Sequence, residues 1–229
     1  MELPSEKITL IDNRILVSGT DEVGLHQRFC HVVSTFSQQN RFSQSIQKIE
    51  LATQLARDAL IQFGQTFVMK GQVGYGALLA FASGSEFNLC EFAVGSFDPE
   101  FKTEDRWFAS IGSGQLITDP FLGFLQKIFW PSTRRRAPST KEGVFFAAWA
   151  LTHAIELNPG GINGPIKLAI LKASDQGTTA RLLDESETAE HKNSVISAED
   201  CLRSYAQELR GETKLSVSIE IPLPEINDY

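Results

Sequence analysis

The chain has 229 residues, of which 42% are hydrophobic, and its formal net charge at pH 7 is −7. This length and composition are typical of a globular protein with one large domain or two small ones. The acidic balance excludes a general binder of nucleic acids or anionic membranes, because phosphate recognition needs a basic surface. No apolar run has the length of a membrane span, and residues 1–20 lack the pattern of a secretory signal, so we expect a cytoplasmic protein.

The sequence predicts neither a metal site nor a cofactor. The cysteines are odd in number, far apart and without a CxxC pair, which suits a reducing compartment and small core residues. They are Cys30, Cys90 and Cys201. His26 and His31 do not share a helical face, and His153 has no ligand partner at metal spacing, so we interpret all three as structural or surface histidines.

The first third of the chain predicts a hairpin followed by two helices. Strand-like runs at 7–11 and 14–18 flank Asp12-Asn13, a pair suited to a tight turn. Thr20 is predicted to cap the first helix, and a second helix is expected at about 45–64, where a glycine ends it. The residues expected on the buried face of the first helix are Leu25, Phe29, Val32 and Phe36.

The middle of the chain predicts a second hairpin and a third strand. The hairpin strands are expected at 75–83 and 86–94, on either side of Gly84-Ser85. A third strand is expected at 106–111. It leads into Gly112-Ser113-Gly114 and then into a helix with apolar residues at helical spacing.

The last third predicts two helices separated by two strands. Ser139 and Glu142 have the spacing of a capping box at a helix start. Strands are expected at 166–172 and 179–184, and Ser197 is predicted to begin the last helix together with Asp200.

Helices are thus grouped between blocks of strands, which differs from the strict alternation of a doubly wound parallel sheet. We therefore expect the α+β class, with two sheets between helical layers in four layers. Residues 1–185 are predicted to form this domain, and the helix and tail of 186–229 are predicted to pack on it. An alternating run at 215–221 predicts a terminal edge strand or an ordered tail.

Several strings, in this order and spacing, resemble proteasome-type subunits and bacterial proteasome-like peptidases of the N-terminal nucleophile (Ntn) hydrolase superfamily. They are KITLI at 7–11, RILVSG at 14–19, WFASIGSG at 107–114 and PGGINGPI at 159–166. The resemblance extends over residues from about 6 to 185. It implies the four-layer αββα sandwich of Ntn hydrolases.

The resemblance also implies three site residues. In that family an N-terminal threonine attacks through its hydroxyl and uses its own α-amino group as the base. Lys7 matches the family's lysine that assists electrostatically, and Ser113 matches the serine of the glycine-serine-glycine turn. Gly19 lies where a backbone amide of the family forms the oxyanion hole.

Two features depart from the family pattern. The sequence begins only a few residues ahead of Lys7, so we expect a domain that is N-terminally truncated and lacks the strand with the threonine. The family's late aspartate and serine would fall in 158–162, which contains neither. Gly19-Thr20 has the form of an autoprocessing junction, but cleavage there would discard Lys7, and we interpret Thr20 as the helix cap.

The leading hypothesis is a proteasome-like subunit, a threonine-type endopeptidase by family, that is inactive as written. Its partners would be like subunits in a ring, polypeptide substrates if active, and an ATP-dependent unfoldase. The rival hypothesis is a non-catalytic structural subunit of such a ring, and a third is an Ntn-type amidohydrolase on a small amide. The basic run Arg134–Arg136 is a solvated loop or a docking site for an acidic patch.

Overall fold

The structure is a computed structural model of the whole chain. It describes residues 7–20, 23–43, 47–67, 74–130, 138–158, 162, 164–174 and 177–211. The chain divides into two compact units, one of Met1–Ala137 with Leu171–Arg181 and the other of Pro138–Ile170 with Leu182–Tyr229. Helices and strands occur in separate blocks, which confirms the predicted α+β class. No helix in the described part of the chain is long and apolar enough to cross a membrane.

The first unit contains a five-stranded antiparallel sheet whose strands follow one another in chain order. The strands are β1 (Ile8–Ile11), β2 (Ile15–Gly19), β3 (Ala77–Ser83), β4 (Glu86–Phe92) and β5 (Pro99–Phe101). Asp12 and Asn13 take left-handed φ angles of 51° and 50° between β1 and β2. Short polar residues tolerate this conformation, so the first predicted hairpin is confirmed together with its turn.

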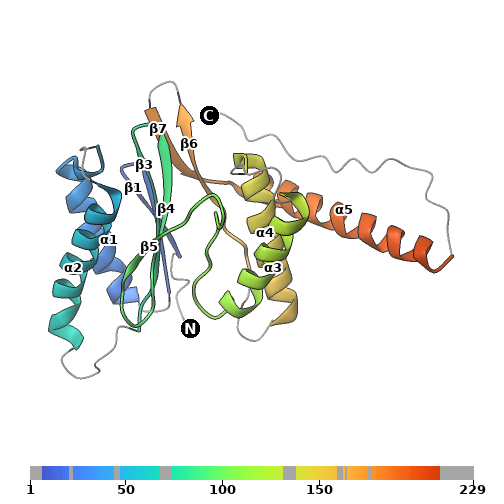
Figure 1. Cartoon of the computed structure of the whole chain (residues 1–229), viewed down its shortest axis with the longest axis horizontal. Coiled ribbons are helices and arrows are strands. Elements are labelled where there is room, and N and C mark those ends of the chain that lie inside the picture. The colour runs from blue at the N-terminus through green and yellow to red at the C-terminus, as the bar shows by residue number, and fades with distance from the viewer. Residues whose placement is uncertain are drawn as a thin grey trace. The chain divides into compact units, whose positions relative to one another are not determined.

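Two helices, α1 (Val23–Gln38) and α2 (Lys48–Phe67), lie on one face of this sheet (Figure 1). The predicted apolar face of α1 is buried, and the core between the helices and the sheet is rich in aromatic rings. Several of these rings meet edge to face: Phe29, Phe63, Tyr75, Phe92 and Phe97. The predicted end of α2 at Gly64 is wrong, because the helix continues for three more residues. A glycine inside a helix costs only about 0.5–1 kcal/mol, which the burial of a side chain such as Phe63 outweighs.

The strand predicted at 106–111 does not form. Only an isolated bridge joins Thr103 and Arg106. β4 pairs with β3 on one side and with the short strand β5 on the other. Trp107 instead packs its ring 5.4 Å from that of Trp130, at the end of α3 (Gln115–Phe129). Residues 106–111 are therefore held by side-chain packing and not by the backbone hydrogen bonds of a sheet.

In the second unit, α4 (Thr140–Leu157) begins at the predicted capping box of Ser139 and Glu142. The prediction that the last helix begins at Ser197 is wrong. Helix α5 (Glu185–Leu209) begins one residue after Asp184, whose side chain accepts a hydrogen bond from the backbone of Glu187. That second capping box starts the helix three turns earlier, and the polar residues before Ser197 lie within it.

The strands β6 (Ala169–Ser174) and β7 (Gly177–Leu182) form a separate two-stranded sheet. The backbone N–H of Ala180 donates to the carbonyl of Asn13 at 2.6 Å, which ties β7 to the turn of the first hairpin. The predicted roles of Arg134–Arg136 and of the tail at 212–229 lie outside the described residues.

Candidate functional site

The three site residues from the resemblance belong to one end of the five-stranded sheet. Lys7 directly precedes Ile8, which is paired with Ser18, and Gly19 follows Ser18 at the end of β2. Lys7 and Gly19 are therefore neighbours across the β1–β2 pair. A side-chain carbon on Gly112 would lie 3.9 Å from Thr20 Cγ2, so the turn that carries Ser113 lies against the same strand end.

Gly19 is buried and has no room for a side chain. A methyl group there would lie 2.5 Å from His26 Nδ1 and 2.6 Å from Tyr75 Oη. These distances are shorter than any van der Waals contact, so the two polar side chains press directly on the Gly19 backbone. Glycine at this position is required by its surroundings.

His26 is the centre of a buried chain of hydrogen bonds below Gly19. Its Nδ1 lies 2.9 Å from Tyr75 Oη, and its Nε2 lies 2.9 Å from Thr9 Oγ1 and 3.6 Å from Cys30 Sγ. Burial lowers the pKa of His26, and the positive charge of Lys7 lowers it further. Burial also raises the pKa values of Tyr75 and Cys30. At neutral pH these hydrogen-bonded groups are therefore uncharged and lie near the cation of Lys7.

The sequence interpretation had placed His26 among the structural or surface histidines, and so missed its position at the site. The periodicity of apolar residues in α1 could have indicated that His26 is buried. His26 lies next to Leu25 and three residues before Phe29, on the stripe that α1 buries against the sheet. A histidine on a buried stripe needs hydrogen-bond partners, and finding those partners requires the fold.

Thr20 is joined to Gly76, and its Oγ1 accepts a hydrogen bond from the backbone N–H of Gly76 at 2.9 Å. Its predicted role as a helix cap depends on residues 21–22, which lie outside the described residues. The Thr20 N–H donates to the Gly76 carbonyl at 3.0 Å. Thr20 thus extends the β2–β3 pair by one step, and its hydroxyl is engaged.

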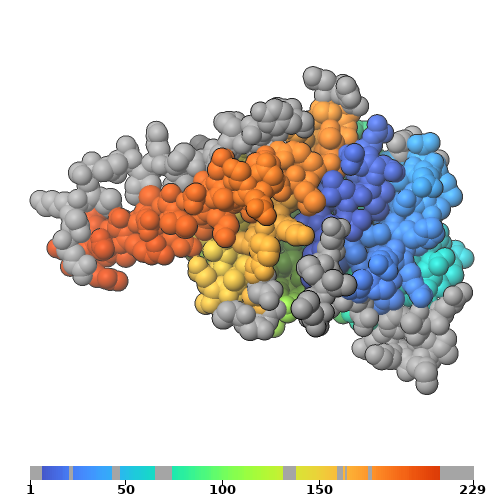
Figure 2. Space-filling model, turned by 180° about the vertical axis from the view of Figure 1, so that it is seen from behind, coloured from blue at the N-terminus to red at the C-terminus, as the bar shows by residue number. Residues whose placement is uncertain are grey.

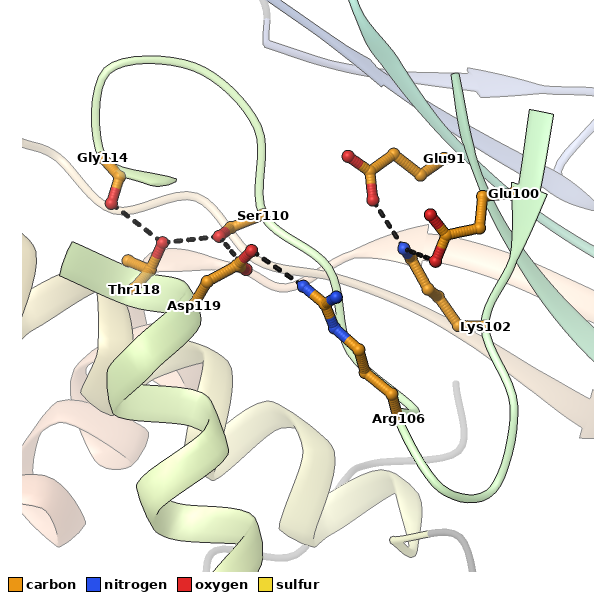
Figure 3. Close-up of polar contacts among 8 residues, drawn as sticks. All are labelled: Glu91, Glu100, Lys102, Arg106, Ser110, Gly114, Thr118 and Asp119. Atoms are coloured by element: carbon orange, nitrogen blue, oxygen red, sulfur yellow. Dashed lines mark hydrogen bonds and ion pairs between the residues drawn. The ribbon is translucent and has the colours of Figure 1, made fainter. Parts of the chain in front are cut away.

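A second polar network supports the turn that carries Ser113 (Figure 3). The Thr118 hydroxyl lies 2.7 Å from Ser110 Oγ and 3.0 Å from the Gly114 carbonyl, across the first turn of α3. Ser110 donates to Asp119, whose other carboxylate oxygen accepts from Arg106 at 3.0 Å. These contacts fix both ends of the glycine-serine-glycine turn to the helix that follows it.

Lys102 joins β4 to β5 beside this network (Figure 3). Its ammonium lies 2.6 Å from Glu91 and 2.7 Å from Glu100, two carboxylates that are register partners on neighbouring strands. Burial alone would lower the pKa of Lys102, but the hydrogen bonds and charges of the two glutamates raise it. We interpret this triad as structural, because it neutralises like charges that would otherwise oppose each other across the ladder.

The described residues contain no group of three or more side chains that could hold a metal ion. The register places Lys7 beside Gly19, and the turn that carries Ser113 approaches Thr20 at the same strand end.

Comparison with family models and with curated proteins finds no match. Solved structures do match. They include a Gly-1 mutant of Anbu from Hyphomicrobium sp. strain MC1, with a TM-score of 0.58 at 15% identity over 90% of this chain and 86% of that one. The chain shares the fold of the Anbu proteins. Anbu from the same strain matches with a TM-score of 0.56 at 14% identity, covering 93% of this chain and 88% of that one.

A third similar structure is Anbu, named as an ancestral β-subunit, from Yersinia bercovieri. It matches with a TM-score of 0.58 at 11% identity over 89% of this chain and 85% of that one. The assignment to proteasome-type subunits lacking their N-terminal strands was therefore wrong. What these structures show for this chain is the Anbu fold.

Proposed function

We propose that this chain is a subunit of an oligomeric, proteasome-like assembly of the Anbu type, in the four-layer architecture expected of Ntn hydrolases. The observation that carries the proposal is the match of nine-tenths of the chain to Anbu, of which one example is named a β-subunit. The cytoplasmic location and an ATP-driven unfoldase as partner belong to the same proposal. Exposed apolar surfaces in both units support it.

In the first unit, α3 presents apolar side chains to solvent. Leu116 is 89% exposed and Phe124 is 54% exposed. Ile128, which is also exposed, continues the same spacing in multiples of four residues along the helix. Pro120 occupies the remaining position of this stripe. A contiguous exposed apolar stripe is typical of a surface that another protein covers.

In the second unit, the buried residues of α5 end at Ala198, although the apolar periodicity continues. Leu202, Tyr205 and Leu209 are all more than half exposed. Figure 2 shows the C-terminal half of α5, in red, beyond the yellow end of α4. An amphipathic helix half of this kind is favoured when its apolar face packs against a further subunit.

Native mass spectrometry with light scattering tests assembly. We expect a discrete oligomer of the wild-type chain at micromolar concentration, and a shift toward smaller species in the double variant Leu116→Asp, Phe124→Asp. Ile61→Asp is the matched control, because it replaces a 62% exposed apolar residue on α2, away from the α3 stripe. A monomeric wild type, or equal effects of both variants, would contradict the proposal.

Hydrolysis of amide bonds in polypeptides is the second candidate function. The observation that favours it is the placement of Lys7 beside Gly19, with the Ser113 turn against the same strand end. The assembly role comes first because the match to Anbu extends over nine-tenths of the chain.

A panel of fluorogenic peptides and small amides, assayed with the assembled protein, tests hydrolysis. Turnover of peptides that falls at least tenfold in Lys7→Gln, with oligomer size unchanged, would support an endopeptidase. Lys127→Gln on α3 is the control. Turnover of small amides alone would favour an amidohydrolase, and no turnover would leave the non-catalytic assembly role.

A further inference from the structure

The hydrogen-bonded chain of Tyr75, His26 and Thr9 lies directly below the candidate site. The His26–Tyr75 bond touches the backbone of Gly19, where even a methyl group would overlap both side chains. Thr9 belongs to β1 and lies two residues after Lys7, which directly precedes this strand. This series of hydrogen bonds therefore extends from the backbone of Gly19 to β1, the strand that follows Lys7.

The direction of these hydrogen bonds follows from the burial of Tyr75. Its side chain is fully buried, and His26 Nδ1 is the hydrogen-bond partner that the described residues give its hydroxyl. If the Tyr75 hydroxyl accepted a hydrogen bond from Nδ1–H, its own O–H would be buried without an acceptor. A buried unsatisfied donor lowers the free energy of unfolding. Tyr75 therefore donates to Nδ1, and the His26 proton is on Nε2, where it donates to Thr9 Oγ1.

Among the described residues, the ionisable groups around His26 come from three parts of the chain. They are Lys7 beside β1, Cys30 one turn further along α1, and Tyr75 ahead of β3. Tyr75 and Cys30 are uncharged at neutral pH, because burial disfavours their anions. A proton on His26 would thus be a second positive charge beside Lys7, with no anion among these groups to balance it.

We propose that Tyr75 and His26 are positioning residues of the candidate site: Tyr75 holds His26 as the neutral Nε2–H imidazole, and the pair fixes the Gly19 backbone beside the cation of Lys7. A role in hydrolysis rests on the second proposed function. The tautomer, the support of Gly19 and the coupling to Lys7 do not depend on it.

Long-range ¹H–¹⁵N NMR of the histidine side chains in the full chain tests the proposal directly. We expect the His26 proton on Nε2 in the wild type. Lys7→Gln should shift the His26 titration midpoint upward, whereas Lys127→Gln should leave it unchanged. A wild-type Nδ1–H tautomer, or a midpoint that does not respond to Lys7→Gln, would overturn the proposal.

Tyr75→Phe tests positioning, because it removes the hydroxyl and keeps the ring. We expect a mixture of His26 tautomers, a higher His26 midpoint and a changed amide resonance of Gly19. An unchanged Gly19 amide and tautomer would refute the positioning role. If Tyr75→Phe does not fold, the two measurements on the wild type and Lys7→Gln still decide the question, since Lys7 is exposed.

The pH dependence of hydrolysis provides a separate test. If the assembly hydrolyses peptides, Tyr75→Phe should move the acid limb of the kcat/KM profile to higher pH, in parallel with the His26 midpoint. An acid limb that stays in place while the midpoint moves would refute a role in hydrolysis. A wild type without hydrolysis would contradict the second proposed function, while the NMR arms would still test the state of His26.

Discussion

Thr20 and Gly76 are joined by two hydrogen bonds, although 56 residues separate them in the sequence. The backbone of Thr20 donates to the Gly76 carbonyl, and the Thr20 hydroxyl accepts from the Gly76 N–H. The next pair along the ladder, Gly19 and Ala77, belongs to β2 and β3. The strand end at the candidate site is therefore closed by a side chain where the regular ladder stops.

Replacement of Thr20 by valine should destabilise the protein by about 1–2 kcal/mol, because the Gly76 N–H loses its acceptor in a half-buried position. Thr20→Ser keeps the hydroxyl and should cost less. Urea denaturation of both variants measures the difference. Equal stability of the two would show that the side-chain bond contributes nothing.

Gly19→Ala should destabilise the protein by about 1–3 kcal/mol, since its methyl group would overlap His26 and Tyr75. Gly64→Ala is the matched control. It lies inside α2 with no atom near the added methyl, so it should stabilise the protein by about 0.5–1 kcal/mol. Opposite signs of the two changes in thermal unfolding are the expected result, and a neutral Gly19→Ala would contradict the close approach.

Asp184→Ala should weaken the start of α5 and cost about 1 kcal/mol, because its side chain accepts from the Glu187 N–H. Ser197→Ala should change stability by less than about 0.5 kcal/mol, since Ser197 lies in the interior of the same helix. Circular dichroism during chemical denaturation distinguishes these positions. A larger effect at Ser197 would place the helix start where the sequence had suggested it.

Lys102→Met should cost about 2–3 kcal/mol, because the Lys102 side chain is only 2% exposed and its loss leaves Glu91 without its ion pair. Glu100 is the exposed member of the triad, and Glu100→Gln should cost less than about 1 kcal/mol. Denaturation at low and high salt tests this ranking. Similar small effects of both variants would indicate a solvated pair.

Stability should fall as the pH drops below about 6.5, because burial lowers the pKa values of His26 and His191 in the folded state. In the window between each folded pKa and the higher unfolded pKa, the unfolded chain binds more protons, so the free energy of unfolding rises with pH. The contribution is complete above this window and is lost as the pH falls through the folded pKa. Each group can add a slope of at most about 1.4 kcal/mol per pH unit.

The double variant His26→Gln, His191→Gln should flatten this dependence in urea titrations between pH 7 and pH 5. A slope in the double variant that matches that of the wild type would assign the pH dependence to other groups.

Lys7, Gly19 and Ser113 are a prediction from short strings with a fixed order. The hairpin register places the first two side by side, and their role in a site stays a prediction. His26 and Tyr75 could not be predicted, because their bond joins residues 49 positions apart. The Thr118–Ser110 contact likewise forms only once α3 and the preceding segment are folded together.

The sequence by itself determined the features that depend on neighbours in the chain. The Asp12-Asn13 turn, the buried face of α1 and the capping box at Ser139 each depend on residues within a few positions, and all are present in the structure. The tertiary structure decided whether a strand-like pattern becomes a strand. Residues 106–111 have that pattern, but the Trp107 ring packs against Trp130 and the segment stays out of the sheet. Thr20 pairs with Gly76 for the same physical reason: partners distant in sequence become available only when the chain is folded.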